Sequence, residues 1–186
     1  MEKYWNQALT FNEYMQEAEK RVQQTANTDE YFTYYELGLH RMERTLKTFS
    51  IEPEHLEEVK NKQFKGKILI ISEPWCGDAS ATVPAVAKFF EAAGIEVKVF
   101  LRDADVTLID QFLTNGTQSI PKVLILSEDF TVRNTWGPRP KYGVELLKKF
   151  KENETVYPRE VFYNDLQVYY AKNRGKDAIE EILNLI

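Results

Sequence analysis

The sequence contains few of the residues that form disulfides and metal centres. Its 186 residues include one cysteine and two histidines. A single cysteine excludes an internal disulfide, and the usual zinc ligand sets cannot be assembled from so few ligands. We therefore expect no metal and no cofactor.

Long apolar runs and an excess of positive charge are also missing. The longest apolar run, residues 67–71, is far too short to span a membrane, and residues 1–10 lack the charged start and apolar segment of a secretory signal. The 24 basic and 29 acidic residues give a net charge of −5, with no basic stripe that would favour nucleic acid. We expect a cytoplasmic protein that binds neither membranes nor nucleic acid.

What the sequence does contain is enough apolar content, 43%, for one domain with its own core. Residues 1–63 show helical spacing throughout. Thr10 and Glu13 have the spacing of a capping box, and Pro53 suits the first turn of a helix over 53–62. These patterns predict a helical N-terminal extension over residues 1–65.

At Gly66 the periodicity changes to alternating strands and helices. The predicted strands are 67–72, 95–101, 123–126 and 130–136. The predicted helices among and after them are 79–93, 106–113, 141–151, 158–172 and 176–186. We predict one α/β domain, 1–186, with a core over 66–151 and C-terminal helices over 152–186.

One motif carries candidate chemistry. The segment Trp75-Cys76-Gly77-Asp78-Ala79 joins the first core strand to the first core helix, where backbone N–H groups and the helix dipole favour a thiolate. Pro84 follows inside that helix, where a kink is expected. Ile120-Pro121 opens the third core strand, and a cis bond is one way to place proline there.

Together these features, in this order, resemble the thioredoxin superfamily over about residues 66–151. The segments 73–79, 119–121 and 136–140 are similar to a bacterial branch with a WCGDA monothiol motif and extra helices around the core. The resemblance implies a thioredoxin-like fold, with a central mixed sheet flanked by helices, in a cytoplasmic protein. It also implies a cis-proline beside the active-site cysteine.

Two departures from that superfamily concern its chemistry. Ala79 stands where a dithiol thioredoxin has its resolving cysteine, and Ile70 stands where such proteins bury an acid. Without a second thiol, a mixed disulfide at Cys76 cannot be resolved from within the chain. We therefore expect no dithiol reductase activity, and whether the chain is an enzyme stays open.

The electrostatics around Cys76 do not fix its reactivity from sequence. The helix start favours the thiolate by about 0.3–2 kcal/mol. A carboxylate of Asp78 at ~6 Å would oppose it by roughly 2–3 kcal/mol at an effective dielectric of ~20, and Glu73 adds to this. Ser80 and Thr82 either donate hydrogen bonds to a thiolate or cap the helix.

The candidate site follows from the motif and the resemblance. Cys76 is the candidate nucleophile. Arg139 either clamps a carboxylate, such as that of Asp78, or is a solvated loop residue. The residue before the cis-proline is implied to pair with an extended peptide or a small thiol. The candidate binding residues are Trp75, Gly77, Asp78, Ile120, Pro121 and Arg139.

Three functions are consistent with this site. The first is monothiol exchange, in which Cys76 forms a mixed disulfide with a protein disulfide or a low-molecular-weight thiol. The second is a non-catalytic module that binds a peptide or protein, favoured by the large helical extensions. The third is an iron–sulfur site completed by an external thiol, which the negative charge of Asp78 disfavours. The sequence does not indicate an oligomeric state.

Overall fold

The computed structural model describes all residues, 1–186, and it contains one five-stranded mixed sheet. The spatial order of the strands is β1-β3-β2-β4-β5. Strand β2 pairs in parallel with β3 and antiparallel with β4, while β1 and β5 form the antiparallel edges. The strands are β1 (Leu9–Thr10), β2 (Lys67–Ser72), β3 (Val97–Leu101), β4 (Lys122–Leu126) and β5 (Val132–Trp136).

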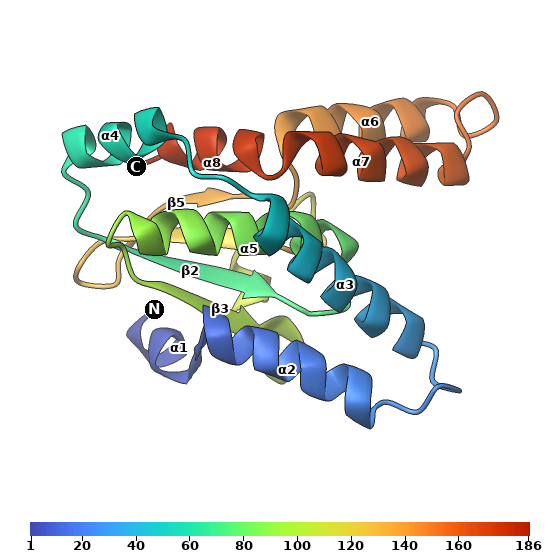
Figure 1. Ribbon diagram of the computed structural model, residues 1–186, viewed down its shortest axis with the longest axis horizontal. Helices are drawn as coiled ribbons and strands as arrows, with labels where there is room; N and C mark the ends of the chain where they lie inside the picture. Colours follow the sequence, from blue (N-terminus) through green and yellow to red (C-terminus); the bar gives the residue numbers. More distant parts are fainter.

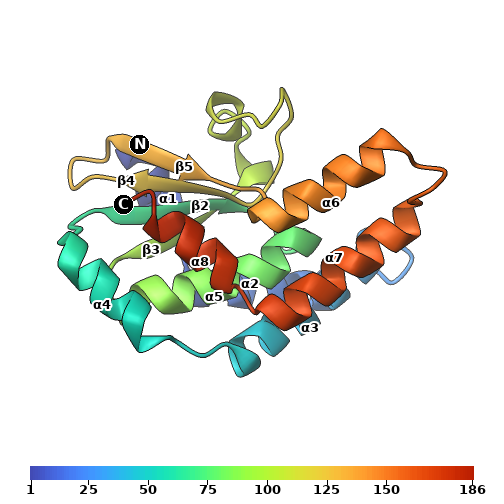
Figure 2. The same ribbon diagram turned by 90° about the horizontal axis from the view of Figure 1, so that it is seen from above.

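Eight α-helices surround this sheet (Figure 1). Helix α5 packs against β2 and β3, and α3, α7 and α8 pack against α5 in turn. Helices α6 and α7 form a hairpin that extends past the sheet (Figure 2). The helices are α1 (Glu2–Gln7), α2 (Phe11–Gln24), α3 (Phe32–Thr48), α4 (Pro53–Lys62), α5 (Gly77–Ala92), α6 (Lys141–Glu152), α7 (Arg159–Asn173) and α8 (Lys176–Leu183).

The central strands explain where the core lies. All residues of β4 and all but the first of β2 are buried, whereas the middle of β5 is exposed. One continuous hydrophobic cluster runs from Trp5 in α1, through the sheet and α5, to Leu183 in α8. A smaller cluster lies beneath the α6–α7 hairpin. The terminal helices therefore share the main core with the sheet.

Most predicted elements are present. The capping box of Thr10 and Glu13 begins α2, and α4 spans the predicted residues 53–62. Pro84 lies inside α5. Helix α5 begins at Gly77, two residues earlier than predicted, because Cys76 already takes the N-cap position.

Two predictions of secondary structure are wrong. Residues 1–63 are not helical throughout, because Leu9 and Thr10 form strand β1 against Val99 and Lys98. Such a two-residue strand has no period of its own and depends on its partner.

The helix predicted over 106–113 is replaced by a turn and one short 3₁₀ helix, η2 (Ile109–Gln111), and a second short 3₁₀ helix, η1 (Arg102–Ala104), precedes this segment. Asp105 accepts hydrogen bonds from the backbone N–H and the hydroxyl of Thr107, at 3.0 and 2.5 Å. Such local side-chain bonds compete with the helical ladder, and a segment of this length is too short to resist them.

Candidate functional site

Cys76 lies where the central strand β2 passes into α5. It is the N-cap residue of α5, with an extended backbone, and no side chain caps this helix. Its own N–H donates to the carbonyl of Glu73, and its carbonyl accepts from Ser80 at the first helical turn. The thiol is therefore held at the helix start, with only 7% of the residue exposed.

The Cys76 sulfur contacts the segment before β4. Its Sγ donates a hydrogen bond to the carbonyl of Ile120 at 3.4 Å. The peptide bonds Ile120–Pro121 and Gly137–Pro138 are both cis. A Cβ on Gly137 would lie 2.2 Å from the carbonyl oxygen of Pro121, so only glycine allows these two segments to approach so closely. Ile120 is 5% exposed and Pro121 is buried, so neither offers an open docking edge.

The surroundings of Cys76 oppose ionisation of its thiol. Burial raises the pKa of Cys76 to about 12, and the negative charge of Asp78 acts in the same direction. The backbone N–H groups of Ala79 and Asp78, together with Arg139, lower this pKa but do not outweigh burial. The sequence predicted that the helix start lowers the pKa of Cys76 and that Asp78 raises it. Burial adds a larger increase, which the sequence alone does not reveal.

Asp78 and Arg139 form a buried ion pair beside the thiol. Arg139 Nη2 lies 2.6 Å from Asp78 Oδ2, and the Tyr170 hydroxyl donates to Asp78 Oδ1 at 2.8 Å. Burial raises the pKa of Asp78, and the guanidinium and the hydroxyl work against that increase. Of the two predicted alternatives for Arg139, the structure contains the carboxylate clamp.

Glu73 is a buried carboxyl group that sequence reasoning treated only as a nearby charge. It is 2% exposed and accepts the backbone N–H of Asp103 at 2.7 Å. Burial raises the pKa of Glu73 to about 7. No signal in the sequence separates this acid from an exposed one after a strand.

Trp75 lines the pocket beside Cys76 and contacts Asp103, the residue whose backbone N–H Glu73 accepts. Its indole Nε1 donates to Asp103 Oδ2 at 3.1 Å, and the guanidinium carbon of Arg102 lies 4.9 Å from the ring centroid. The ring centroid of Tyr31 lies 6.0 Å from that of Trp75. These three contacts fix the orientation of Trp75 beside Cys76.

Ser80 and Thr82 do neither of the two things predicted for them. The Ser80 hydroxyl donates to the carbonyl of Gly77 at 2.9 Å, and the Thr82 hydroxyl donates to the carbonyl of Asp78 at 2.9 Å. Both hydroxyl groups bond to a carbonyl of the preceding helical turn, as hydroxyl side chains inside helices commonly do. They therefore bond neither to the thiol nor to the free N–H groups at the helix start.

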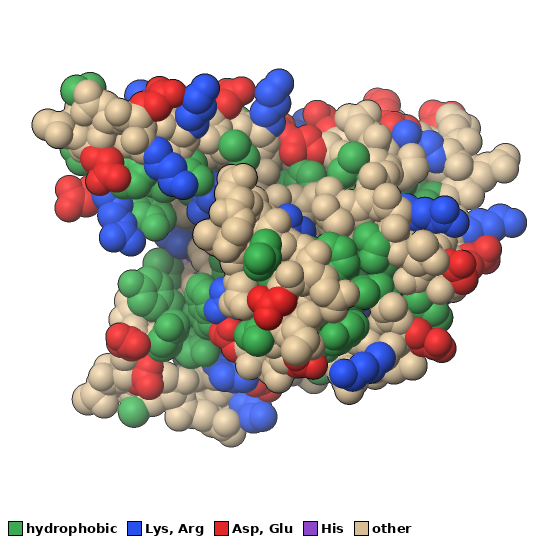
Figure 3. All heavy atoms as spheres, turned by 180° about the vertical axis from the view of Figure 1, so that it is seen from behind, with side chains coloured by type: hydrophobic (Ala, Val, Ile, Leu, Met, Phe, Trp, Pro, Cys, Tyr) green, Lys and Arg blue, Asp and Glu red, His purple; other side chains and the backbone are tan.

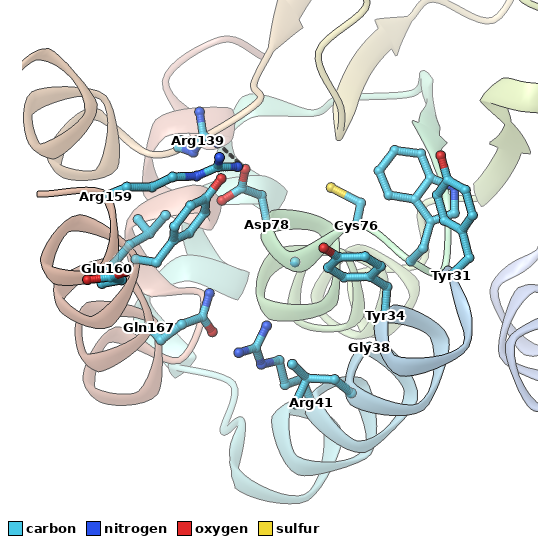
Figure 4. Close-up of a pocket in the computed structure, with 15 residues that line it drawn as sticks. Tyr31, Tyr34, Gly38, Arg41, Cys76, Asp78, Arg139, Arg159, Glu160 and Gln167 are labelled. Carbon is cyan, nitrogen blue, oxygen red and sulfur yellow. Dashed lines mark ion pairs between the residues drawn. The ribbon is translucent and has the colours of Figure 1, made fainter. Parts of the chain in front are cut away.

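A pocket of about 760 Å³ lies over Cys76, between α3, the first turn of α5 and α7 (Figure 4). Tyr34 and Cys76 lie on one side of it, Arg159 and Glu160 lie on the other, and Arg41 closes a third. From behind, a notch with hydrophobic side chains on its floor separates the α6–α7 hairpin from the α2–α3 end (Figure 3). The lining residues are Tyr31, Tyr34, Leu37, Gly38, Arg41, Trp75, Cys76, Gly77, Asp78, Arg139, Arg159, Glu160, Tyr163, Leu166 and Gln167.

The structure brings five of the candidate residues together at this pocket. They are Trp75, Cys76, Gly77, Asp78 and Arg139. Ile120 and Pro121 do not line the pocket: the carbonyl of Ile120 contacts the sulfur, and Pro121 is buried. Sequence reasoning missed the lining residues of α3 and α7, because nothing in a helical pattern tells which distant helix will cover a site.

A protein-family model described as thioredoxin matches residues 25–151, which is more than half of the chain. The chain belongs to the thioredoxin family. The match begins before α3, a helix within the predicted N-terminal extension over residues 1–65. No curated protein matches this sequence.

Two solved structures share the thioredoxin-like fold over almost the whole chain. One is a protein of unknown function from Pseudomonas aeruginosa, with a TM-score of 0.64 and 17% identity, covering 96% of this chain and 91% of its own. The other is an HIV epitope scaffold, with a TM-score of 0.65 and 16% identity, covering 98% of this chain and 94% of its own. At these identities the likeness establishes the fold alone.

This thioredoxin-family chain has one cysteine. The two residues at which it departs from dithiol thioredoxins are both apolar and buried. Ala79 and Ile70 are each 0% exposed. No group of three or more His, Cys, Asp or Glu side chains is placed to hold a metal ion. No helix has both the length and the apolar character that crossing a membrane requires.

Proposed function

We propose that this thioredoxin-family chain is a binding protein, which takes a small molecule into the pocket over Cys76 and does not use an activated thiol. The observation that carries this proposal is the pocket itself, enclosed by α3 and α7 around a thiol that is 7% exposed. Its volume of about 760 Å³ falls within the range of small-molecule sites.

The shape of the site favours a small molecule over an extended peptide. Strand addition needs free backbone groups at an open edge. Ile120 and Pro121 are buried, and the carbonyl of Ile120 already accepts the Cys76 thiol. A peptide that paired with Ile120 would have to displace this contact.

The raised pKa of the thiol argues in the same direction. With a pKa of about 12, Cys76 is almost entirely protonated at neutral pH, and the protonated thiol is not the nucleophile. A free cysteine titrates near pH ~8.5. Cys76 therefore begins with a far smaller thiolate fraction than an ordinary cysteine.

The test is the rate of iodoacetamide alkylation of Cys76 against pH in the native protein. Because the chain has one cysteine, the rate needs no separation of sites. We expect a midpoint well above ~8.5, compared with the same chain unfolded in urea, and Cys76→Ser supplies the background rate. A native midpoint below the unfolded one would contradict the proposal.

A second candidate function is monothiol exchange, favoured by the backbone N–H groups of Asp78 and Ala79 that stabilise the thiolate of Cys76. Cys76 would lose its proton to solvent and attack a low-molecular-weight disulfide. A new S–S bond to Cys76 would form as the old one breaks and releases one thiolate. A second small thiol would then attack the mixed disulfide and regenerate Cys76.

Incubation with hydroxyethyl disulfide followed by intact-mass measurement tests this candidate. Exchange predicts rapid addition of one mercaptoethanol group to the native chain and none to Cys76→Ser. The binding proposal expects the adduct to form much more slowly in the native chain than in the unfolded one, since exchange requires the thiolate.

A further inference from the structure

The arginines of this chain are unevenly supplied with carboxylate partners. Of eight arginines, three form ion pairs, namely Arg21, Arg102 and Arg139. Four of the other five line the groove between α3 and α7, by which we mean the pocket over Cys76 together with a smaller cavity of about 70 Å³ that shares Arg41 and Gln167 with it. These four are Arg41, Arg44, Arg159 and Arg174.

The groove offers almost no negative charge to balance these cations. Its acidic lining residues are Asp78 and Glu160. Asp78 is already held by Arg139 and Tyr170, which leaves Glu160 at the rim. The whole chain carries a net charge of −5, so a groove with this excess of arginine differs from the rest of the molecule.

Arg41 occupies the centre of the groove, where it lines both cavities. Its Nη1 atom lies 3.4 Å from the place where a Cβ on Gly77 would stand, so the guanidinium rests against the first turn of α5. That turn has free backbone N–H groups and the positive end of a 16-residue helix. Two positive features therefore meet at one point, without a carboxylate bonded to Arg41.

We propose that this groove binds a small organic anion, a carboxylate or a phosphate, whose charged group lies beside Arg41 at the first turn of α5. The inference rests on the proposed function and names its ligand class. Guanidinium groups and helix N-termini both recognise such anions through directed N–H groups. The exposed rings of Tyr34 and Tyr163 border the same pocket and provide apolar faces for the body of the ligand.

The experiment is isothermal titration of the full chain with four probes. Pyrophosphate and citrate represent the two sources of negative charge, ADP adds an aromatic body, and adenosine lacks the charge. We expect at least one of the three anions to bind with a Kd below about 1 mM and at least about tenfold more tightly than adenosine. The ranking of citrate against the phosphates identifies the preferred anionic group.

The decisive comparison is between two arginine variants. Arg41→Gln should weaken binding of the anion by about tenfold or more, because a charge-assisted hydrogen bond is lost. Arg133→Gln is the matched control, since Arg133 also makes no ion pair but lies on β5, outside the groove. Arg159→Gln changes an exposed side chain, so it repeats the test should Arg41→Gln fail to fold.

Failure of this inference differs from failure of the proposed function. Absence of binding by all three anions at about 10 mM, or equal affinity in the groove variants and in Arg133→Gln, overturns the anion site alone. A low alkylation midpoint for Cys76 overturns the proposed function, even where arginine-dependent binding is found.

Discussion

At the scale of single residues, Asp78 acts on its two neighbours in opposite ways. Its carboxylate stabilises the charge of Arg139 at 2.6 Å and destabilises the thiolate of Cys76. Arginine stays charged at neutral pH, so the pair favours the ionised form of Asp78. One charge thus maintains the ion pair on the pocket wall and adds to the burial that keeps the thiol protonated.

Replacing that charge is therefore expected to make the thiol more reactive. Asp78→Asn keeps the shape of the side chain but removes a contribution that raises the pKa of Cys76, and it leaves Arg139 unpaired beside the sulfur. We predict at least about tenfold faster iodoacetamide alkylation at pH 8.5, since below its pKa a thiol gains tenfold in thiolate for each unit that the pKa falls.

The same substitution should lower the free energy of unfolding by about 1.5–3 kcal/mol, because a charge-assisted bond is lost. Asp103→Asn is the control, as this acid contacts Trp75 but does not contribute to the Cys76 pKa. Equal alkylation rates in the two variants would show that Asp78 does not act on the thiol.

Residue-scale features differ in how far sequence predicts them. The contact between Arg139 and Asp78 was one of two predicted alternatives, because two rigid prolines restrict that arginine. The burial of Glu73 and the backward hydrogen bonds of Ser80 were not predictable. Motif spacing carries the first kind of information, whereas burial depends on elements far away in the chain.

At the scale of elements, the close approach of α3 to the site depends on a glycine. Gly38 lies in the middle of α3, where glycine is otherwise unfavourable by about 1 kcal/mol relative to alanine. A Cβ at this position would lie 2.3 Å from the backbone carbonyl oxygen of Pro74. The helix can therefore rest directly on the loop before Cys76.

We predict that Gly38→Ala destabilises the protein, despite the better helix propensity of alanine. The clash is with backbone, which cannot rotate away, so we expect a net loss of about 1–3 kcal/mol in the free energy of unfolding. Gly77→Ala is the control, because its Cβ would meet only the end of the Arg41 side chain at 3.4 Å. Urea unfolding of both variants gives the comparison, and an equal or higher stability of Gly38→Ala would contradict the packing argument.

Elements with their own periodic signal were predicted well, and elements formed by tertiary contacts were not. The buried run of β2 and the helix over 53–62 needed only local pattern. Strand β1 depends on its pairing with β3, and residues 106–113 follow the hydrogen bonds of Asp105 and its neighbours instead of their apolar spacing.

At the scale of the whole molecule, the site is assembled from four separate parts of the chain, namely α3, the Cys76 motif, Arg139 and α7. Helix α3 precedes the Cys76 motif and α7 follows it, and both pack against α5. The sequence predicted the helices and the thioredoxin-like fold but not this arrangement, since the helical patterns are equally compatible with other placements. The pocket, and hence the binding proposal, is a property of the assembled fold.

The buried carboxyl group of Glu73 makes the stability of this fold depend on pH. Its pKa is about 7 in the native protein, because burial disfavours the charged form, against an ordinary value of 4.5. Between pH 4.5 and pH 7, Glu73 therefore holds a proton in the native state that it has released in the unfolded chain. The contribution of Glu73 to stability is complete below pH 4.5 and is lost as the pH rises through 7. This shift corresponds to about 2–3 kcal/mol between pH 5 and 8.

We therefore predict that the free energy of unfolding of the parent falls by about 2–3 kcal/mol more than that of Glu73→Gln between pH 5 and pH 8. Glutamine retains an acceptor for the N–H of Asp103 but cannot titrate, so subtraction removes the contributions of all other groups. Urea unfolding of both proteins at the two pH values provides the measurement. An equal fall in the free energy of unfolding of the two proteins would contradict the prediction. It would mean that the carboxyl group of Glu73 is as hydrated in the native protein as in the unfolded chain.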